Sequence, residues 1–142
     1  MSTIPLTRRG SEKLKEELHR LTTAERHALI QAISAARAQG DLSENAEYEA
    51  AKDKQGFIEG RILEIEGKLA AAQVIDPATL DAEGRVVFGS TVELEDEASG
   101  TRVTYQIVGD DEADLKLGLI SISSPIARAL IGRPAGDVAE VK

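Results

Sequence analysis

The sequence predicts a two-part protein in which a long helical hairpin precedes a small α+β domain. From residue 6 to residue 75 the apolar residues recur at helical spacing, with one break at Gly40. Beyond Pro77 apolar and polar residues alternate, which is typical of β-strands. The charge also divides: residues 1–75 carry a net −1 and residues 76–142 carry −7, together the formal −8 of the chain.

The first arm of the hairpin is predicted from Thr7 to about Gln39, with Thr7 as N-cap and Leu6 packed on the first turn. Its apolar seam comprises Leu14, Leu18, Leu21, Leu29, Ile33 and Ala36. The steps are three or four residues except between Leu21 and Leu29, where the step is eight. This local stutter predicts a flattened supercoil.

The second arm is predicted from about Ser43, and Pro77 should end it. Its seam keeps a heptad pattern for about three repeats. The seam residues are Ala51, Gln55, Ile58, Ile62, Ile65, Leu69 and Ala72. Both seams are rich in Ala toward the turn and in Leu or Ile away from it, which predicts a better-packed base. Each arm of about 30 residues should extend on the order of 45 Å.

The second half predicts a small antiparallel sheet packed by one helix. Strands are expected at residues 86–88, 91–95, 102–108, 119–122 and 138–141. Ser124 and Pro125 should open a short helix that Gly132 closes. The predicted domains are residues 1–75 and 85–142, joined by a linker over residues 76–84, with the last strand cut short at Lys142.

Composition excludes several classes of function. The chain has no Cys, so disulfides and thiolate metal sites are excluded. No apolar run approaches the roughly 20 residues of a membrane helix, so we expect a cytoplasmic protein that does not contact a membrane. The acidic second half would repel phosphates, so nucleic-acid contacts should fall on basic residues of the first half.

The turn between the arms carries two carboxylates, Asp41 and Glu44, three residues apart. This spacing is close to a capping box, and acidic residues are favoured at a helix N-terminus. Alternatively, two carboxylates on one turn can share Mg²⁺. Two carboxylates alone would bind Mg²⁺ weakly, so such a site would matter only where a second site supplies the other ligands. The spacing alone leaves both interpretations open.

Basic residues flank this turn. Arg37 lies one helical turn before Gly40, and Lys52 lies in the facing arm. Together they could hold a phosphate backbone beside the two carboxylates. They could equally be surface charges that pair with Glu49 or Asp53.

Four segments carry a resemblance to a known family. Residues 40–48, GDLSENAEY, are similar to the tip signature of the bacterial transcript cleavage factors, the GreA/GreB family. Residues 120–132, ISISSPIARALIG, resemble the C-terminal signature of that family, and residues 6–10 and 108–114 match as well. The resemblance covers essentially the whole chain. It looks closer to the GreA members, because the tip carries Leu42 and the arms lack a dense basic patch.

The resemblance implies an N-terminal antiparallel coiled coil and an FKBP-like C-terminal domain. The C-terminal domain would dock on RNA polymerase, and the coiled coil would enter the secondary channel of the polymerase. There the tip would stimulate the polymerase to hydrolyse the 3′ end of backtracked nascent RNA. The factor itself would be a monomer without a bound cofactor and without enzymatic activity of its own.

The resemblance also implies roles for individual residues. Asp41 and Glu44 would act in catalysis by holding a Mg²⁺ ion shared with the polymerase active site. Arg37 and Lys52 would contact RNA. The tip would be shaped by Gly40, Ser43, Asn45 and Tyr48. The polymerase-docking segment would be Ser123, Ser124 and Pro125, although some members carry an acidic residue where Ser123 stands.

Three other functions are compatible with parts of the sequence. The first is a non-cleaving secondary-channel regulator or inhibitor of RNA polymerase with the same architecture. The second is a zinc-containing channel regulator, which the absence of Cys opposes. The third is a peptidyl-prolyl isomerase or chaperone, but an aromatic content of 3% leaves little to line a proline pocket.

Overall fold

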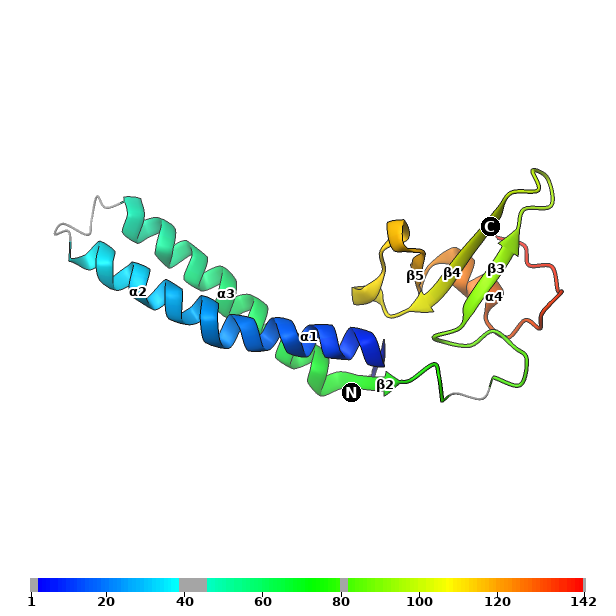
Figure 1. Cartoon of the computed structure of the whole chain (residues 1–142), viewed down its shortest axis with the longest axis horizontal. Coiled ribbons are helices and arrows are strands. Elements are labelled where there is room, and N and C mark those ends of the chain that lie inside the picture. Colours follow the sequence, from blue (N-terminus) through cyan, green and yellow to red (C-terminus); the bar gives the residue numbers. More distant parts are fainter. Residues whose placement is uncertain (1–2, 39–45, 80–81, 142) are drawn as a thin grey trace. The chain divides into compact units, whose positions relative to one another are not determined.

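The structure is a computed structural model that describes residues 3–38, 46–79 and 82–141. It has a long helical N-terminal part followed by a small sheet domain with a helix (Figure 1). Two units can be distinguished. Glu12–Ala71 form what we call the helical unit, and Met1–Ser11 with Ala72–Lys142 form the sheet unit. The sequence-based division at residues 75 and 85 stays a prediction.

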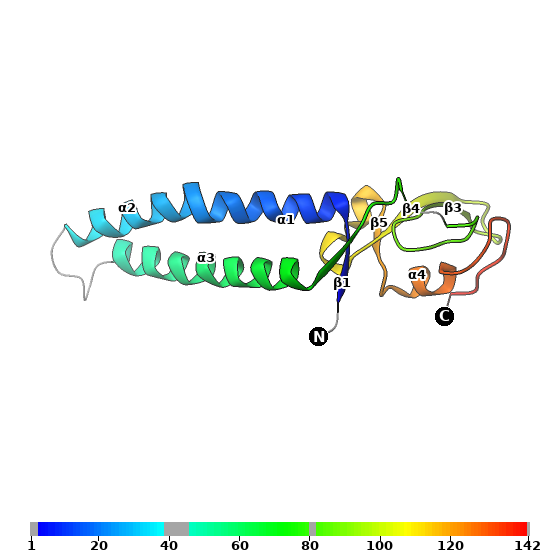
Figure 2. The same cartoon turned by 90° about the horizontal axis from the view of Figure 1, so that it is seen from below.

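The helical unit consists of two arms that lie side by side. The first arm contains α1 (Arg8–Arg20), of which Arg8–Ser11 belong to the sheet unit, the π-helical turn η1 (Leu21–Glu25) and α2 (Arg26–Arg37). The second arm is α3 (Ala46–Ala71). Figure 2 shows α3 running alongside the first arm. In the described part of the chain, no helix is both long enough and apolar enough to cross a membrane.

The predicted seams form the core of the helical unit. The buried apolar side chains of the two arms are those of Leu14, Leu21, Leu29, Ala36, Ile58, Ile62 and Ile65. By contrast, Phe57 and Leu63, which lie off the seam, are 81% and 70% exposed. Helical periodicity therefore identified which face of each arm is buried, and the Leu- and Ile-rich part of the seam supplies most of the buried side chains.

The π turn explains the step of eight residues in the first seam. A step of eight is one heptad plus one residue, and a π turn accommodates one extra residue per turn. Leu21 and Leu29 are therefore both buried, at 6% exposure each. Hydroxyl groups bond to the carbonyls of the preceding turn: Thr22 Oγ1 donates to Leu18 O at 2.8 Å and Thr23 Oγ1 to His19 O at 2.6 Å. The predicted stutter is thus concentrated in a single turn.

The start of the chain differs from the sequence-based expectation. Ile4–Thr7 form strand β1, which pairs in parallel with β2 (Ala72–Ile75), so the first helix begins at Arg8 and the second ends at Ala71. Two four-residue segments so far apart in sequence leave no local signal of pairing. The N-cap prediction is confirmed, because the Gly10 amide donates to Thr7 Oγ1 at 3.1 Å.

Glu112 forms hydrogen bonds that hold the N-terminal residues of the chain within the sheet unit. Its carboxylate accepts hydrogen bonds from the Thr7 amide at 3.0 Å, the Gly109 amide at 2.9 Å, and the Thr7 hydroxyl. A side chain at Gly10 would collide with this carboxylate. A larger residue at this position would therefore displace the Glu112 carboxylate.

The larger sheet is mixed rather than antiparallel. Strand β3 (Thr91–Glu95) pairs antiparallel with β4 (Arg102–Val108), as the alternation predicted, but β5 (Leu119–Ser121) pairs parallel to β4. The connection contains the 3₁₀ turns η3 (Asp110–Glu112) and η4 (Leu115–Leu117), and it brings Leu119 back beside Gln106 in the second half of β4. Alternation marks a strand but not its direction, so the prediction of an all-antiparallel sheet is wrong.

The core of the sheet unit lies between this sheet and helix α4 (Pro125–Leu130). It is built from Phe88, Ile107, Ile120 and Ala127, the last of which is fully buried. Two predicted strands are wrong. Residues 86–88 form a loop, in which Val86 exchanges backbone hydrogen bonds with Gly132 and Arg133. No described strand pairs with residues 138–141, and without a partner alternation does not make a strand.

Candidate functional site

The predicted tip falls on a segment outside the described residues. Asp41 and Glu44, together with Gly40, Ser43 and Asn45, lie within residues 39–45. The structure does place the ends of both arms beside this segment, since α2 ends at Arg37 and α3 begins at Ala46. The roles of the five residues stay predictions.

The two predicted RNA-contacting residues lie on the two arms that flank the segment. Arg37 is the last residue of α2 and Lys52 lies in the second turn of α3, and both are exposed. Lys52 Nζ donates to Gln55 Oε1 at 2.9 Å on its own helix. Tyr48, predicted to shape the tip, is half-buried in the first turn of α3. Contact with RNA stays a prediction for both cations.

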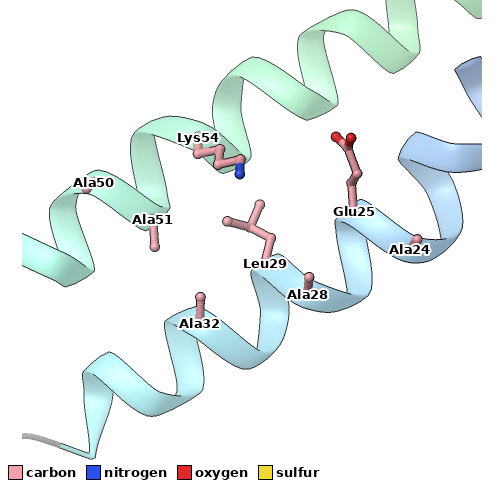
Figure 3. Close-up of a pocket in the computed structure, with 8 residues that line it drawn as sticks. All are labelled: Ala24, Glu25, Ala28, Leu29, Ala32, Ala50, Ala51 and Lys54. Atoms are coloured by element: carbon pink, nitrogen blue, oxygen red, sulfur yellow. The ribbon is translucent and has the colours of Figure 1, made fainter.

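A groove of about 410 Å³ lies between the arms on the tip side of the buried core. Figure 3 shows the alanines that leave this space open, with the Leu29 side chain standing in the gap. Its lining residues are Ala24, Glu25, Ala28, Leu29, Ala32, Ala50, Ala51 and Lys54. The Glu25 carboxylate and the Lys54 amine, from opposite arms, give this otherwise apolar groove its polar groups (Figure 3).

Two bidentate ion pairs join the arms of the helical unit. Arg26 donates from Nε and Nη2 to Glu59 at 2.9 and 2.7 Å, and Arg61 donates to Glu17 at 2.7 and 2.8 Å. The hydrogen bonds from Arg61 hold the pKa of Glu17 below its ordinary value. Bidentate geometry fixes orientation as well as distance, so these pairs help to hold the register of the two arms.

The predicted polymerase-docking segment connects β5 to α4 in the sheet unit. Ser124 is the N-cap of α4, because its Oγ accepts from the Ala127 amide at 3.2 Å, and Pro125 is the first helical residue. The sequence-based capping prediction is therefore confirmed. Ser123 and Pro125 are exposed. Their docking role stays a prediction.

One carboxylate beside this segment was not singled out from the sequence. Asp110 Oδ1 accepts hydrogen bonds from the hydroxyls of Ser121 and Ser123, the second at 2.7 Å. These two bonds lower the pKa of Asp110 below its ordinary value, with Ser121 the larger cause. In sequence Asp110 was only the first residue of an acidic loop, eleven residues from Ser121.

The structure offers no separate metal centre in residues 3–38, 46–79 and 82–141. No group of three or more His, Asp or Glu side chains there is placed to hold an ion. Asp41 and Glu44 lie outside those ranges, so their chemistry is judged from their residue types and spacing.

Comparison with known proteins covers both units of the chain. Residues 4–74 match the family model described as transcription elongation factor, N-terminal. Residues 81–142 match the model described as transcription elongation factor, GreA/GreB, C-term. The chain belongs to the GreA/GreB family.

Individual GreA/GreB relatives are similar over almost the whole chain. The chain is 72% identical over 142 residues to transcription elongation factor GreA of Verminephrobacter eiseniae, covering 100% of this chain and 90% of that protein. It is 74% identical over 141 residues to the GreA of Ralstonia nicotianae, covering 99% and 89%. Among solved structures, GreA factor homolog 1 of Thermus thermophilus is 32% identical over 98% of this chain and 89% of that chain, with a TM-score of 0.47.

Proposed function

We propose that this protein is a GreA-type transcription elongation factor that stimulates RNA polymerase to cleave backtracked nascent RNA. The observation that carries the proposal is identity of 72% and 74% to proteins named transcription elongation factor GreA, over essentially the full chain. In this proposal the pair Asp41 and Glu44, which lies between α2 and α3 in the sequence, supplies the chemistry.

The two carboxylates suit a shared magnesium ion. Mg²⁺ takes one or two protein carboxylates and fills its remaining positions with water and phosphate oxygens. Hydrolysis of a phosphodiester by two metal ions needs a clamp on both the attacking and the leaving oxygen. Asp41 and Glu44 would complete the ligand set of one ion inside the polymerase, while Arg37 and Lys52 would contact the RNA backbone.

The fold details of the family belong to the same proposal. The heptad spacing of the α3 seam and its burial at Ile58, Ile62 and Ile65 support an antiparallel coiled coil. A small sheet packed by α4 is compatible with an FKBP-like C-terminal domain. In this proposal the coiled coil enters the secondary channel, and Ser123, Ser124 and Pro125 dock on the polymerase.

The protein would act as an activator rather than as an enzyme. It would bind no cofactor alone, function as a monomer, and have RNA polymerase and backtracked nascent RNA as its partners. A cytoplasmic location follows from the proposed partner.

Stalled, backtracked elongation complexes provide the test. The wild-type protein should accelerate release of 3′ RNA fragments, and should release none from free RNA without polymerase. Asp41→Ala or Glu44→Ala should lower the saturating cleavage rate by at least about 100-fold, the scale of losing one preorganised electrostatic group. Binding to polymerase should be unchanged.

Asp53→Ala is the matched control, since it removes an exposed carboxylate of α3. This variant should cleave like the wild type. Normal cleavage by the Asp41→Ala/Glu44→Ala double variant would refute the mechanism. Slowed elongation without any cleavage by the wild type would favour the non-cleaving channel regulator instead.

A further inference from the structure

We propose that Asp110 is a positioning residue that holds the Ser121–Ser123 turn in the conformation that docks on RNA polymerase. The inference rests on the proposed function, because it assumes that the segment after β5 is the docking surface. Asp110 would act through the two serines and would not itself need to touch the partner.

The contacts converge on a single oxygen atom. Asp110 Oδ1 accepts from Ser121 Oγ and from Ser123 Oγ, the latter at 2.7 Å. The two hydroxyl oxygens are 2.8 Å apart, and the Ser123 amide donates to Ser121 Oγ at 3.1 Å. Side chains and backbone of the turn are thus tied to one carboxylate from the neighbouring connection.

The turn is fixed at both of its ends by other bonds. On one side Ile107 and Ile120 pair in the sheet. On the other, the Ser124 amide donates to Ser121 O at 3.0 Å and Ser124 Oγ caps α4. The exposed Ser123 side chain lies between these anchors, and its hydroxyl is within hydrogen-bonding distance of Asp110 Oδ1 and Ser121 Oγ. Asp110 therefore sets the direction of the hydroxyl at the predicted docking surface.

Position along the chain explains why this carboxylate is well placed. Asp110 follows Gly109, which is buried and whose amide is held by Glu112 at 2.9 Å. The backbone before Asp110 is therefore anchored in the interior of the sheet unit. A charged acceptor on an anchored backbone is a stronger and better-oriented partner for hydroxyl groups than water is.

The expected effect is on affinity and not on the cleavage step. Asp110→Ala removes the acceptor and should raise the concentration of factor that gives half-maximal cleavage by roughly 3- to 10-fold, as for loss of exposed charge-assisted hydrogen bonds. The rate at saturating factor should stay at the wild-type value. Asp110→Asn keeps an acceptor oxygen without the charge, so its half-maximal concentration should lie between those of the wild type and Asp110→Ala.

Glu97→Ala is the matched control, because it removes one exposed carboxylate from the turn between β3 and β4 of the same unit. It should leave the half-maximal concentration unchanged. A change equal to that of Asp110→Ala would show that net charge, and not position, sets affinity, and would overturn the inference.

A double-mutant cycle separates positioning from a general loss of stability. Ser121→Ala/Ser123→Ala should raise the half-maximal concentration at least as much as Asp110→Ala does, because it also removes the Ser123 hydroxyl from the docking segment. Adding Asp110→Ala to it should change nothing further. Additive effects would overturn the inference. If Asp110→Ala lowers the melting temperature of the sheet unit, the serine variant still tests the positioning role.

Direct binding of labelled protein to polymerase distinguishes the two proposals. If the wild-type protein stimulates cleavage and the Asp110→Ala variant binds polymerase with equal affinity, only the positioning role is refuted. Wild-type protein that binds without cleavage would refute the cleavage function. In that case the loss of affinity in Asp110→Ala would still support the positioning role, and its absence would refute it.

Discussion

Acidic side chains are used differently in the helical unit and in the sheet unit. In the helical unit the carboxylates of Glu17, Glu59 and Glu64 each accept from an arginine or lysine at 2.7 to 3.0 Å. In the sheet unit many carboxylates instead accept from backbone amides or hydroxyls. Asp76 accepts from the Ala78 amide at 3.0 Å, and Asp96 from the Ala98 amide at 2.8 Å.

The difference accounts for the uneven charge along the chain. Carboxylates that accept from amides and hydroxyls at turns need no cation nearby, so a region rich in turns can become acidic at little cost. Ion pairs also occur in the sheet unit, as between Arg102 and Glu93 at 3.6 Å. The acidity of residues 76–142 therefore reflects turn formation as well as solvation.

The largest effect should come from the core that supports these turns. Ile107 is fully buried, and Ile107→Ala should destabilise the sheet unit by about 2–5 kcal/mol. Hydrogen exchange of β4 amides would measure the loss, with α3 amides as the internal reference. Leu117→Ala, at a position that is 65% exposed, should change stability by less than about 0.5 kcal/mol. Equal loss of protection in α3 would contradict an effect confined to the sheet unit.

The next largest effect should come from Glu112, which accepts from two amides and a hydroxyl. Glu112→Ala leaves the Thr7 and Gly109 amides without their acceptor and should cost about 1–3 kcal/mol. Denaturant unfolding would measure the change. Glu97→Ala, a turn carboxylate, serves as control. Gly10→Ala should also destabilise, because its added carbon displaces the Glu112 carboxylate. A neutral Gly10→Ala would show that this carboxylate can move at no cost.

A smaller effect is expected from the pair of Glu17 and Arg61, which are about 30% exposed. A double-mutant cycle with Glu17→Gln and Arg61→Met should give a coupling of about 0.5–1 kcal/mol. Because dissolved salt screens the attraction between charges, the coupling energy should decrease as the salt concentration rises. The coupling energy from the same cycle on Asp110 and Ser123 should depend much less on salt. An equal salt dependence would contradict the difference between the carboxylates of the two units.

The smallest effect is on the dependence of stability on pH. The pKa of Glu17 is lowered from 4.5 by Arg61, and that of Asp110 from 3.8 by Ser121 and then Ser123. A carboxyl whose pKa is lowered by folding contributes stability that is complete above its ordinary pKa and is lost as pH falls through the lowered value. Thermal melts from about pH 6 to about pH 3 should therefore show declining stability. Glu17→Gln and Asp110→Asn should each flatten that decline, and an unchanged slope in both would contradict the assignment.

The parts that could be predicted from sequence are those specified by local repetition. Helical periodicity located the buried faces of both arms, and the cap residues Thr7 and Ser124 were identified from residue type and position. The step of eight in the first seam located the irregular turn, although not its π geometry. Each of these signals lies within a few residues along the chain.

The parts that were missed depend on partners distant in sequence. The parallel pairing of Ile4–Thr7 with Ala72–Ile75 and the parallel direction of β5 have no local signature. The same holds for the roles of Asp110 and Glu112, since Glu112 bonds to Thr7 across 105 positions. Resemblance to a family indicated what the tip and the docking segment would do, while contacts in three dimensions were needed to connect Asp110 with that segment.

The π turn at Leu21–Glu25 has a consequence for how the length of the arm can change. Removing one residue from an ordinary α-helix rotates everything beyond it by about 100°, which would turn the seam away from α3. Removing one residue within this turn would instead convert it to regular α-helix and keep Leu29 facing the other arm. The turn is thus the place in the first arm where the loss of one residue would leave the seam beyond it facing α3.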